Sequence, residues 1–371
     1  MTLTKRSYLD FNATAPSRPE VIDAVVTSMR RWGNASSVHK DGRVARSCVE
    51  KAREQVAALV GGSTKNVIFT GSGTEANNHA LRSVDAERLI VSAIEHESII
   101  NIRKDIVICP VRENGILDLG ALEQLLSDSK KQTTVSIMFA NNETGIIQPV
   151  KEVARLTQKF GAFFHCDAVQ AVGKIPVNFE SLGADSLAIS AHKIGGPQGV
   201  GALVCRNLKN ISSFIHGGGQ ESGLRGGTEN VPGIVGYGVA ADAALSGLPS
   251  FSNLAKLRNA MECRVLKIKP DAMVFGRDLN RLPNTSKFAT KGLKSEVQVV
   301  GLDLDGISIS AGSACSSGRI ETPYVLAAMG VPEELGRCAI RVSLGWTTTG
   351  DDIDRFIASW KSLCDRKLVN N

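Results

Sequence analysis

The stretch SAHKIGGPQGVGALV (residues 190–204) joins an apolar run, a lysine and a glycine-rich turn. Lys193 comes directly after SLAIS (186–190), and a second apolar run, GALVC, starts at residue 201. Runs that are apolar throughout are typical of strands buried on both faces of a sheet. The stretch therefore predicts two buried strands, with the lysine at the end of the first.

Similar runs lie N-terminal to this stretch: NVIFT (66–70), RLIVSAI (88–94), DIVICPV (105–111), TTVSIMFA (133–140) and AFFHCDA (162–168). Helical patterns separate or precede them: HKDGRVARSCVEKAREQVAALVGG (39–62), ILDLGALEQLLSD (116–128) and PVKEVARLTQKF (149–160). This alternation predicts an α/β fold around a mostly parallel sheet. We expect a large domain over about residues 15–250, and a smaller α+β domain formed by residues 1–14 and 251–371.

The composition limits the functional classes. A chain of 371 residues exceeds what one compact core usually holds, which also favours two domains. The net charge of +6, from 43 basic and 37 acidic residues, is mild, and no nucleic-acid-binding motif accompanies it. No apolar run approaches the roughly 20 residues of a membrane span. The start MTLTKRSYLD lacks a secretory signal, so we expect a cytoplasmic protein.

The eight cysteines are scattered, without CxxC or a Cys/His metal spacing, so no intrinsic metal site is expected. Most of them should be small buried residues. Cys315 differs, because it lies in AGSACSSGRIETP (311–323), where almost nothing large is available to pack. Such a stretch is typical of an exposed loop, where a thiolate is a strong nucleophile. The alternative is an incidental surface thiol.

Ligands of open α/β sheets bind beyond the carboxyl ends of the strands, so the residues after each run are the candidates. GSGTEANN (71–78) begins a helix near Thr74, and free N–H groups there favour phosphate, although a purely structural turn is the alternative. EHES contributes His96, and NNETG (141–145) is either a polar cluster or a turn. Asp167 and Gln170 follow the run FFHC.

Two of these residues suggest a cofactor. Asp167 is either a helix N-cap or a buried counter-ion for a ligand cation, and burial requires that it have a partner. Lys193 is either a surface lysine or a nucleophile activated by desolvation and neighbouring cations. A phosphate cradle, a buried carboxylate, a slot under His96 and a nucleophilic lysine together match pyridoxal 5′-phosphate. Lys193 would form the Schiff base, and Asp167 would keep the ring nitrogen protonated.

The chain resembles the cysteine desulfurases of the NifS/IscS group, which are fold-type-I pyridoxal-phosphate enzymes. The resemblance runs from YLDFNATAP (8–16) to IRVSLGWTTTGDDID (340–354), nearly the full length. It includes GNASSVH (33–39), TGSGTEANN, EHES, NNETG, HCDAVQ, SAHKIGGPQG, GGGQESGLRGGTEN (217–230) and GSACSSG.

The resemblance implies a role for each matching position. Lys193 would hold the cofactor, and its phosphate would be bound by Gly73, Thr74, Ser190, His192 and, from the second subunit of a homodimer, Thr228. His96 would stack on the ring and move protons. Asp167 would contact the ring nitrogen, and Gln170 would contact the phenolic oxygen. Asn142 would lie beside either the phenolic oxygen or the substrate. Arg341, with Asn34, would bind the substrate carboxylate.

The implied reaction converts L-cysteine to L-alanine and leaves the sulfur on Cys315 as a persulfide. An acceptor protein, such as an iron–sulfur scaffold, would take the sulfur for iron–sulfur cluster or other thio-cofactor assembly, and Cys315 would transiently ligate a cluster on such a partner. The chain departs from many members at Gly71-Ser72 and at Gly226. Its last residues are SLCDRKLVNN (362–371), whereas some members carry a longer tail that docks the iron–sulfur scaffold, and this leaves the partner open.

Three alternatives remain at this point. A selenocysteine lyase or another β-lyase would keep the cofactor and change the reaction. A sulfur carrier or scaffold-interaction protein would have a vestigial site, which the joint presence of Lys193, Asp167, His96 and Cys315 disfavours. A nucleotide-binding protein would use GSGTE, but the chain lacks a full dinucleotide or P-loop pattern.

Overall fold

The computed structural model describes residues 6–312 and 324–369. Its largest sheet has seven strands in the order β2-β8-β7-β6-β5-β3-β4. Their bounds are β2 (Val67–Thr70), β3 (Arg88–Ser92), β4 (Val107–Cys109), β5 (Thr133–Met138), β6 (Phe163–Asp167), β7 (Ser186–Ser190) and β8 (Gly201–Cys205). Each corresponds to a run predicted from the sequence. Only β8 runs antiparallel to its neighbours, β7 and β2, so the sheet is mostly parallel as expected.

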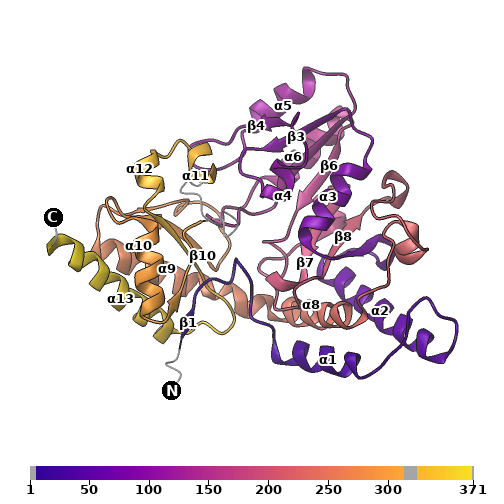
Figure 1. Ribbon diagram of the computed structural model, residues 1–371. Coiled ribbons are helices and arrows are strands. Elements are labelled where there is room, and N and C mark those ends of the chain that lie inside the picture. The colour runs from indigo at the N-terminus through magenta and orange to yellow at the C-terminus, as the bar shows by residue number, and fades with distance from the viewer. Residues whose placement is uncertain (1–5, 313–323, 370–371) are drawn as a thin grey trace.

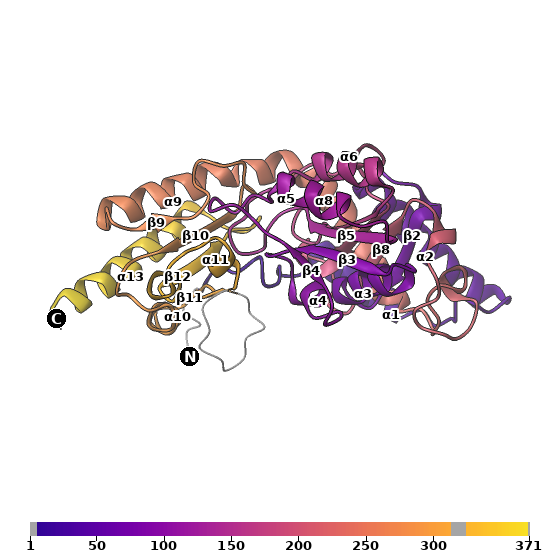
Figure 2. The same cartoon turned by 90° about the horizontal axis from the view of Figure 1, so that it is seen from above.

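Helices cover both faces of this sheet, as the wholly buried residues of β5, β7 and β8 require. Figure 2 shows α5 and α6 on one side of the strands, and α3 and α4 on the other. The helices of this region are α1 (Pro19–Met29), α2 (Lys40–Leu59), α3 (Gly73–Ser83), α4 (Glu97–Ile100), α5 (Leu119–Ser127), α6 (Val150–Phe160), α7 (Phe179–Leu182) and α8 (Val231–Ser252). Short 3₁₀ helices are η1 (Thr64–Asn66), η2 (Ala191–Lys193), η3 (Leu208–Asn210) and η4 (Gln220–Gly223).

Helix α8 corrects one expectation from the sequence. It is 22 residues long and, by length and composition, apolar enough to cross a membrane, although no such run was expected. Its many glycines and alanines serve close helix packing, because α8 lies along α2 and α1 (Figure 1). A Cβ at Gly238 would stand 2.8 Å from the Ala52 Cα atom of α2, a distance that Cβ atoms essentially never show. The composition of α8 is therefore explained by packing inside the fold.

A smaller antiparallel sheet places β10 (Thr285–Ala289) between β9 (Met273–Val274) and β12 (Ala339–Ser343). A separate parallel pair joins β1 (Ser7–Tyr8) to β11 (Ile307–Ser308). The helices here are α9 (Leu254–Ile268), α10 (Ser295–Leu304), α11 (Tyr324–Ala328), α12 (Glu333–Gly336) and α13 (Gly350–Val369).

The core of this smaller region contains aromatic residues in edge contact: Phe288 of β10 meets Phe356 and Trp360 of α13. Leu9 and Phe251 belong to the same buried cluster, so the N-terminal segment packs with the C-terminal third of the chain. This arrangement agrees with the N-terminal segment joining the smaller domain. The exact division at residues 14 and 250 stays a prediction.

Candidate active site

A cavity of about 270 Å³ lies at the carboxyl ends of the parallel strands. Most of the residues that the sequence nominated line it: Gly73, Thr74, His96, Asn142, Asp167, Gln170, Ser190, His192, Lys193 and Arg341. All but Arg341 come from the large sheet and the turns that follow its strands, while Arg341 comes from β12 of the smaller sheet. The cavity therefore lies between the two sheets.

Two nominated residues, Asn34 and Thr228, do not line this cavity, and a third is not described. Asn34 lies in the exposed connection between α1 and α2, where its side chain accepts a hydrogen bond from the N–H of Ser36. Thr228 lines a different cavity, together with Glu221 and Arg225. Cys315 lies outside the described residues. The roles of these three residues stay predictions.

Lys193 ends the 3₁₀ turn η2, directly after β7. Its Nζ atom donates to the main-chain oxygens of Asn12 at 2.6 Å and Ala13 at 2.8 Å, which hold the amine at the cavity wall. The glycines after it serve the turn: Gly195 has φ +84°, and a Cβ at Gly196 would stand 2.9 Å from the carbonyl oxygen of Ala191. The quoted stretch therefore combines a strand end with a turn tight enough to aim the lysine inward.

The N-terminus of α3 forms one end of the cavity. Ser72 caps the helix by accepting from the N–H of Glu75. A Cβ at Gly73 would stand 2.9 Å from a methyl group of Val169, so a larger residue would force this side chain to shift. The hydroxyl of Ser190 is buried without a hydrogen-bond partner among the described residues. A helix N-terminus with an unpartnered hydroxyl beside it suits a phosphate group.

His192 adds a neutral imidazole near this end of the cavity. Burial and the neighbouring charges of Lys193 and Lys174 lower the pKa of His192 to about 4. Its Nδ1 atom lies 3.2 Å from the hydroxyl of Thr14. At neutral pH the ring is therefore uncharged, and it contacts a ligand only by hydrogen bonding or packing.

Asp167 is buried and has the partners that burial requires. Its Oδ1 atom accepts from the N–H of Val169, and its Oδ2 atom accepts from the side-chain amide of Asn77, both at 2.9 Å. The bond to Val169 is the turn-capping role considered above, and it coexists with a carboxylate that lines the cavity. Each of its oxygens has further lone pairs, so the carboxylate can also accept a hydrogen bond from a ligand in the cavity.

Asn77 connects Asp167 to His96. Its amide nitrogen also donates to the hydroxyl of Ser98 at 2.9 Å, and its oxygen lies 2.9 Å from Nε2 of His165. The Nδ1 atom of His96 accepts from the main-chain N–H of Ser98 at 3.1 Å. Because a main-chain N–H only donates, the neutral His96 ring carries its proton on Nε2.

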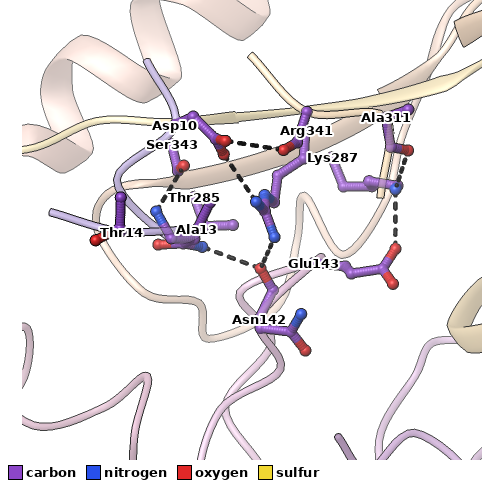
Figure 3. Close-up of polar contacts among 12 residues, drawn as sticks. Asp10, Ala13, Thr14, Asn142, Glu143, Thr285, Lys287, Ala311, Arg341 and Ser343 are labelled. Carbon is purple, nitrogen blue, oxygen red and sulfur yellow. Dashed lines mark hydrogen bonds and ion pairs between the residues drawn. The ribbon is translucent and has the colours of Figure 1, made fainter. Parts of the chain in front are cut away.

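Arg341 extends from β12 to the cavity and is 1% exposed. Its guanidinium donates to a carboxylate oxygen of Asp10 at 2.8 Å and to the main-chain oxygen of Asn142 at 3.2 Å (Figure 3). The other carboxylate oxygen of Asp10 accepts from Ser310. The buried Nε atom of Arg341 has no hydrogen-bond partner among the described residues. The guanidinium thus keeps a donor for a ligand carboxylate.

A buried ion pair lies beside Arg341. The ammonium of Lys287 donates to Glu143 and to the main-chain oxygen of Ala311, each at 2.9 Å (Figure 3). Burial lowers the pKa of Lys287, and the adjacent Glu143 partly opposes this. NNETG is therefore both a turn and a polar cluster, since Asn142 lines the cavity while Glu143 pairs with Lys287 of β10.

Sequence reasoning missed several residues that support this site: Asp10, Asn12, Asn77, Ser98, Lys174, Glu143 and Lys287. Most of them lie inside motifs that were quoted for the resemblance, so those motifs are the signal that was available. Lys174 and Lys287 lie outside those motifs, and nothing local distinguishes them from exposed lysines. Among the described residues, no group of three His, Cys, Asp or Glu side chains is arranged to hold a metal ion.

Comparison with known proteins agrees with this geometry. The family model of aminotransferase class-V matches residues 7–356. A protein of Dictyoglomus turgidum described as cysteine desulfurase IscS is 40% identical over 367 residues, covering 95% of this chain and 93% of that protein.

Solved structures give the same result. A NifS-like protein from Rickettsia africae superposes with a TM-score of 0.90 at 37% identity, over 97% of this chain and 100% of that one. A structure described as SspA in complex with cysteine has a TM-score of 0.77 at 27% identity, over 91% and 98%. The chain therefore belongs to the aminotransferase class-V family, in its cysteine desulfurase group.

Proposed function

We propose that this chain is a pyridoxal-phosphate-dependent cysteine desulfurase that converts L-cysteine to L-alanine and passes the sulfur to Cys315 as a persulfide. The observation that carries this proposal is the convergence of Lys193, Asp167, His96 and Arg341 on one cavity beside the N-terminus of α3. A nucleophilic amine, a ring-nitrogen partner, a stacking imidazole, a carboxylate clamp and an anion cradle are the groups that this reaction needs.

The residues present fit the cofactor. Lys193 would hold it covalently, while Gly73, Thr74, Ser190 and His192 would surround its phosphate. The unpartnered Ser190 hydroxyl supports this assignment, because a buried hydroxyl without a partner is costly unless a ligand supplies one. When bound, the cofactor accepts the electrons released at the substrate carbon.

The chain's own residues would then position the substrate and move protons. Arg341 binds the carboxylate of L-cysteine, and Lys193 takes the proton from its α-carbon. The Cys315 thiolate attacks Sγ of the substrate, the carbon–sulfur bond breaks, and protonation of the carbon gives L-alanine. The sulfur stays on Cys315 until an acceptor protein, such as an iron–sulfur scaffold, takes it in the cytoplasm.

The test separates the two nucleophiles. Lys193→Ala should lose the covalent cofactor and its yellow colour, whereas Cys315→Ser should keep both and lose desulfurase activity, because a serine hydroxyl is scarcely ionised at neutral pH. Cys263→Ser is the matched control, since Cys263 is an exposed cysteine outside the cavity. Alkylation should trap the persulfide at Cys315.

Two results would contradict the proposal. A wild-type protein that stays colourless after addition of the cofactor would remove the pyridoxal-phosphate assignment. Near wild-type release of sulfur and alanine by Cys315→Ser would make the loop cysteine incidental and favour another β-lyase. Activity with selenocysteine but not with cysteine would favour a selenocysteine lyase.

We also propose that the active species is a homodimer in which Thr228 completes the partner's phosphate site. Apolar side chains stand exposed along α1, in the connection that follows it and in the first turns of α2: Ile22, Val26, Met29, Trp32 and Val44. Trp32 is 85% exposed. Trp32 and Val44 line a surface hollow together with Glu229, the residue next to Thr228. This continuity between the apolar patch and the Thr228 loop supports a second copy of the chain as the occupant.

Mixing two weak variants tests the shared site. In a heterodimer of Lys193→Ala with Thr228→Ala, one site carries both changes and the other carries neither. Activity should therefore recover on mixing. If subunit exchange is demonstrated and activity does not recover, Thr228 acts in its own subunit or not at all.

A further inference from the structure

Lys174 is a buried lysine that the proposed reaction does not use. It is 3% exposed, and its Nζ atom donates to the side-chain oxygens of Gln170 at 2.6 Å and Asn12 at 2.7 Å. Both partners are neutral amides, and among the described residues no carboxylate forms an ion pair with it. Burial, Lys193 and Arg341 lower its pKa well below the ordinary value of 10.5. A buried amine without a counter-ion is costly, so its position calls for an explanation.

The first consequence concerns the amide of Gln170. A lysine ammonium only donates, so the atom that it contacts must be the Gln170 oxygen, and this assigns the orientation of the amide. The Gln170 nitrogen then donates to the main-chain oxygen of Asn12 at 3.0 Å. That nitrogen makes no second hydrogen bond among the described residues, and Gln170 lines the cavity. One N–H therefore remains for a ligand oxygen.

The second consequence concerns Lys193. The main-chain oxygen of Asn12 accepts from Lys193 at 2.6 Å, while its side-chain oxygen accepts from Lys174. One asparagine thus holds both lysines, and the charge of Lys193 contributes to the lowered pKa of Lys174. Because a Coulomb interaction acts on both partners, a charged Lys174 also repels a charged Lys193. The remaining cation near Lys174 is Arg341, whose own charge is paired with Asp10.

We propose that Lys174 is a positioning residue for cofactor loading: it aims the Gln170 amide N–H at the phenolic oxygen of the cofactor and, by charge repulsion, favours the uncharged, reactive form of the Lys193 amine. This inference rests on the proposed cofactor. The phenolic oxygen is where the resemblance implies that Gln170 acts, and only an unprotonated amine forms the covalent link.

The test uses the full-length protein freed of cofactor, with covalent incorporation of pyridoxal 5′-phosphate measured against pH by absorbance and by borohydride trapping. Lys174→Met should shift the incorporation midpoint to higher pH. A like charge a few Å away changes ionisation by about one pH unit or more, which is about tenfold in the free amine. Lys159→Met is the control, since Lys159 is an exposed lysine paired with Glu123 on the surface.

A double-variant cycle isolates the route through Gln170. If Lys174 orients that amide, Lys174→Met should weaken cofactor binding much less in a Gln170→Leu background than in the wild type. Lys174→Arg restores the charge and should return the midpoint toward the wild-type value. If Lys174→Met weakens cofactor binding without shifting the pH midpoint of incorporation, the charge repulsion on Lys193 is overturned. The same result supports the orientation of the Gln170 amide by Lys174.

If the Lys174→Met and Lys159→Met variants incorporate the cofactor with the same affinity and the same pH profile, the proposal is overturned. If Lys174→Met does not fold, the wild type still decides the electrostatic half: acylation of Lys193, mapped by mass spectrometry against pH, should have a midpoint below that of Lys159. Equal midpoints overturn it. Failure of the wild type to bind the cofactor at all would instead contradict the proposed function.

Discussion

At the residue scale, single side-chain amides determine the hydrogen bonding of the residues that line this cavity. The ring of His96 has a defined tautomer because the main-chain N–H of Ser98 donates to its Nδ1 atom. The Ser98 hydroxyl, which accepts from the amide of Asn77, lies 2.9 Å from the same Nδ1 atom. The same amide of Asn77 steadies Asp167. Asn77 lines the cavity itself and connects Asp167 with Ser98, the residue that contacts His96.

Asn77→Asp is expected to disrupt both contacts, because it replaces the amide donor with a carboxylate facing Asp167. Loss of a hydrogen bond to a charged group costs about 2 kcal/mol, so cofactor affinity should fall roughly thirtyfold. Proton–nitrogen NMR of the His96 ring should show the proton on Nε2 in the wild type and a mixture in the variant.

Asn78→Asp is the control for this change. Asn78 is the next residue of α3, and its amide donates to the main-chain oxygens of Thr74 and Ser98 instead. An Asn77→Asp variant with unchanged affinity and an unchanged His96 signal would show that the connection between Asp167 and His96 has no functional weight.

At the element scale, the loop that carries Thr228 is held in a strained conformation. Glu221 and Ser222 of η4 have φ values of 47° and 59°, the left-handed region that residues other than glycine rarely adopt. Arg53 of α2 binds the Glu221 carboxylate with two hydrogen bonds, at 2.7 and 2.8 Å, and the N–H of Phe69 adds a third at 2.9 Å. Strain of this kind persists where the surroundings impose it, and it often marks a functional segment.

Arg53→Lys should release this loop, because a lysine cannot reproduce the two-pronged contact of the guanidinium. We expect amide hydrogen exchange in residues 217–230 to rise about tenfold, which corresponds to roughly 1.4 kcal/mol of lost local stability. Cofactor affinity of the proposed dimer should fall with the local stability of this loop. Arg206→Lys is the control, since Arg206 pairs with Glu180 at the surface; the same exchange rates in both variants would refute this account.

At the scale of the whole molecule, buried histidines make the fold sensitive to acid. Burial lowers the pKa of His165 to about 3 from its ordinary 6.5. Between these two values the unfolded chain binds a proton that the folded chain does not, so stability falls as pH decreases below about 6.5. At pH 5 this amounts to about 2 kcal/mol from His165 alone.

Thermal unfolding measured between pH 8 and pH 4 checks this prediction. His165→Asn should flatten the fall in melting temperature below pH 6.5, although its melting temperature at pH 8 should be lower because the bond to Ser186 is lost. His39→Asn, at the exposed start of α2, should leave the wild-type slope unchanged. A wild-type protein whose stability is constant from pH 7 to pH 5 would contradict the assignment.

The sequence by itself determined the strands of the large sheet and most of the cavity wall. Residues such as Lys193, Asp167 and Gly73 follow apolar runs, and the carboxyl ends of parallel strands necessarily meet at one edge. Strand periodicity and turn chemistry depend on residues close together in the sequence, so they can be recognised from the sequence alone. The family resemblance came from the same motifs.

Only the tertiary structure decided what supports those residues. Lys174 and Lys287 look like surface lysines in the sequence, and their burial depends on elements distant in the chain: Asn12 for the first, and Glu143 with Ala311 for the second. The apolar composition of α8 is likewise explained only by the structure, in which α2 and α1 pack against this helix. Burial, amide orientation and ion pairing are properties of contacts between distant segments, and a local pattern carries no information about which segments meet.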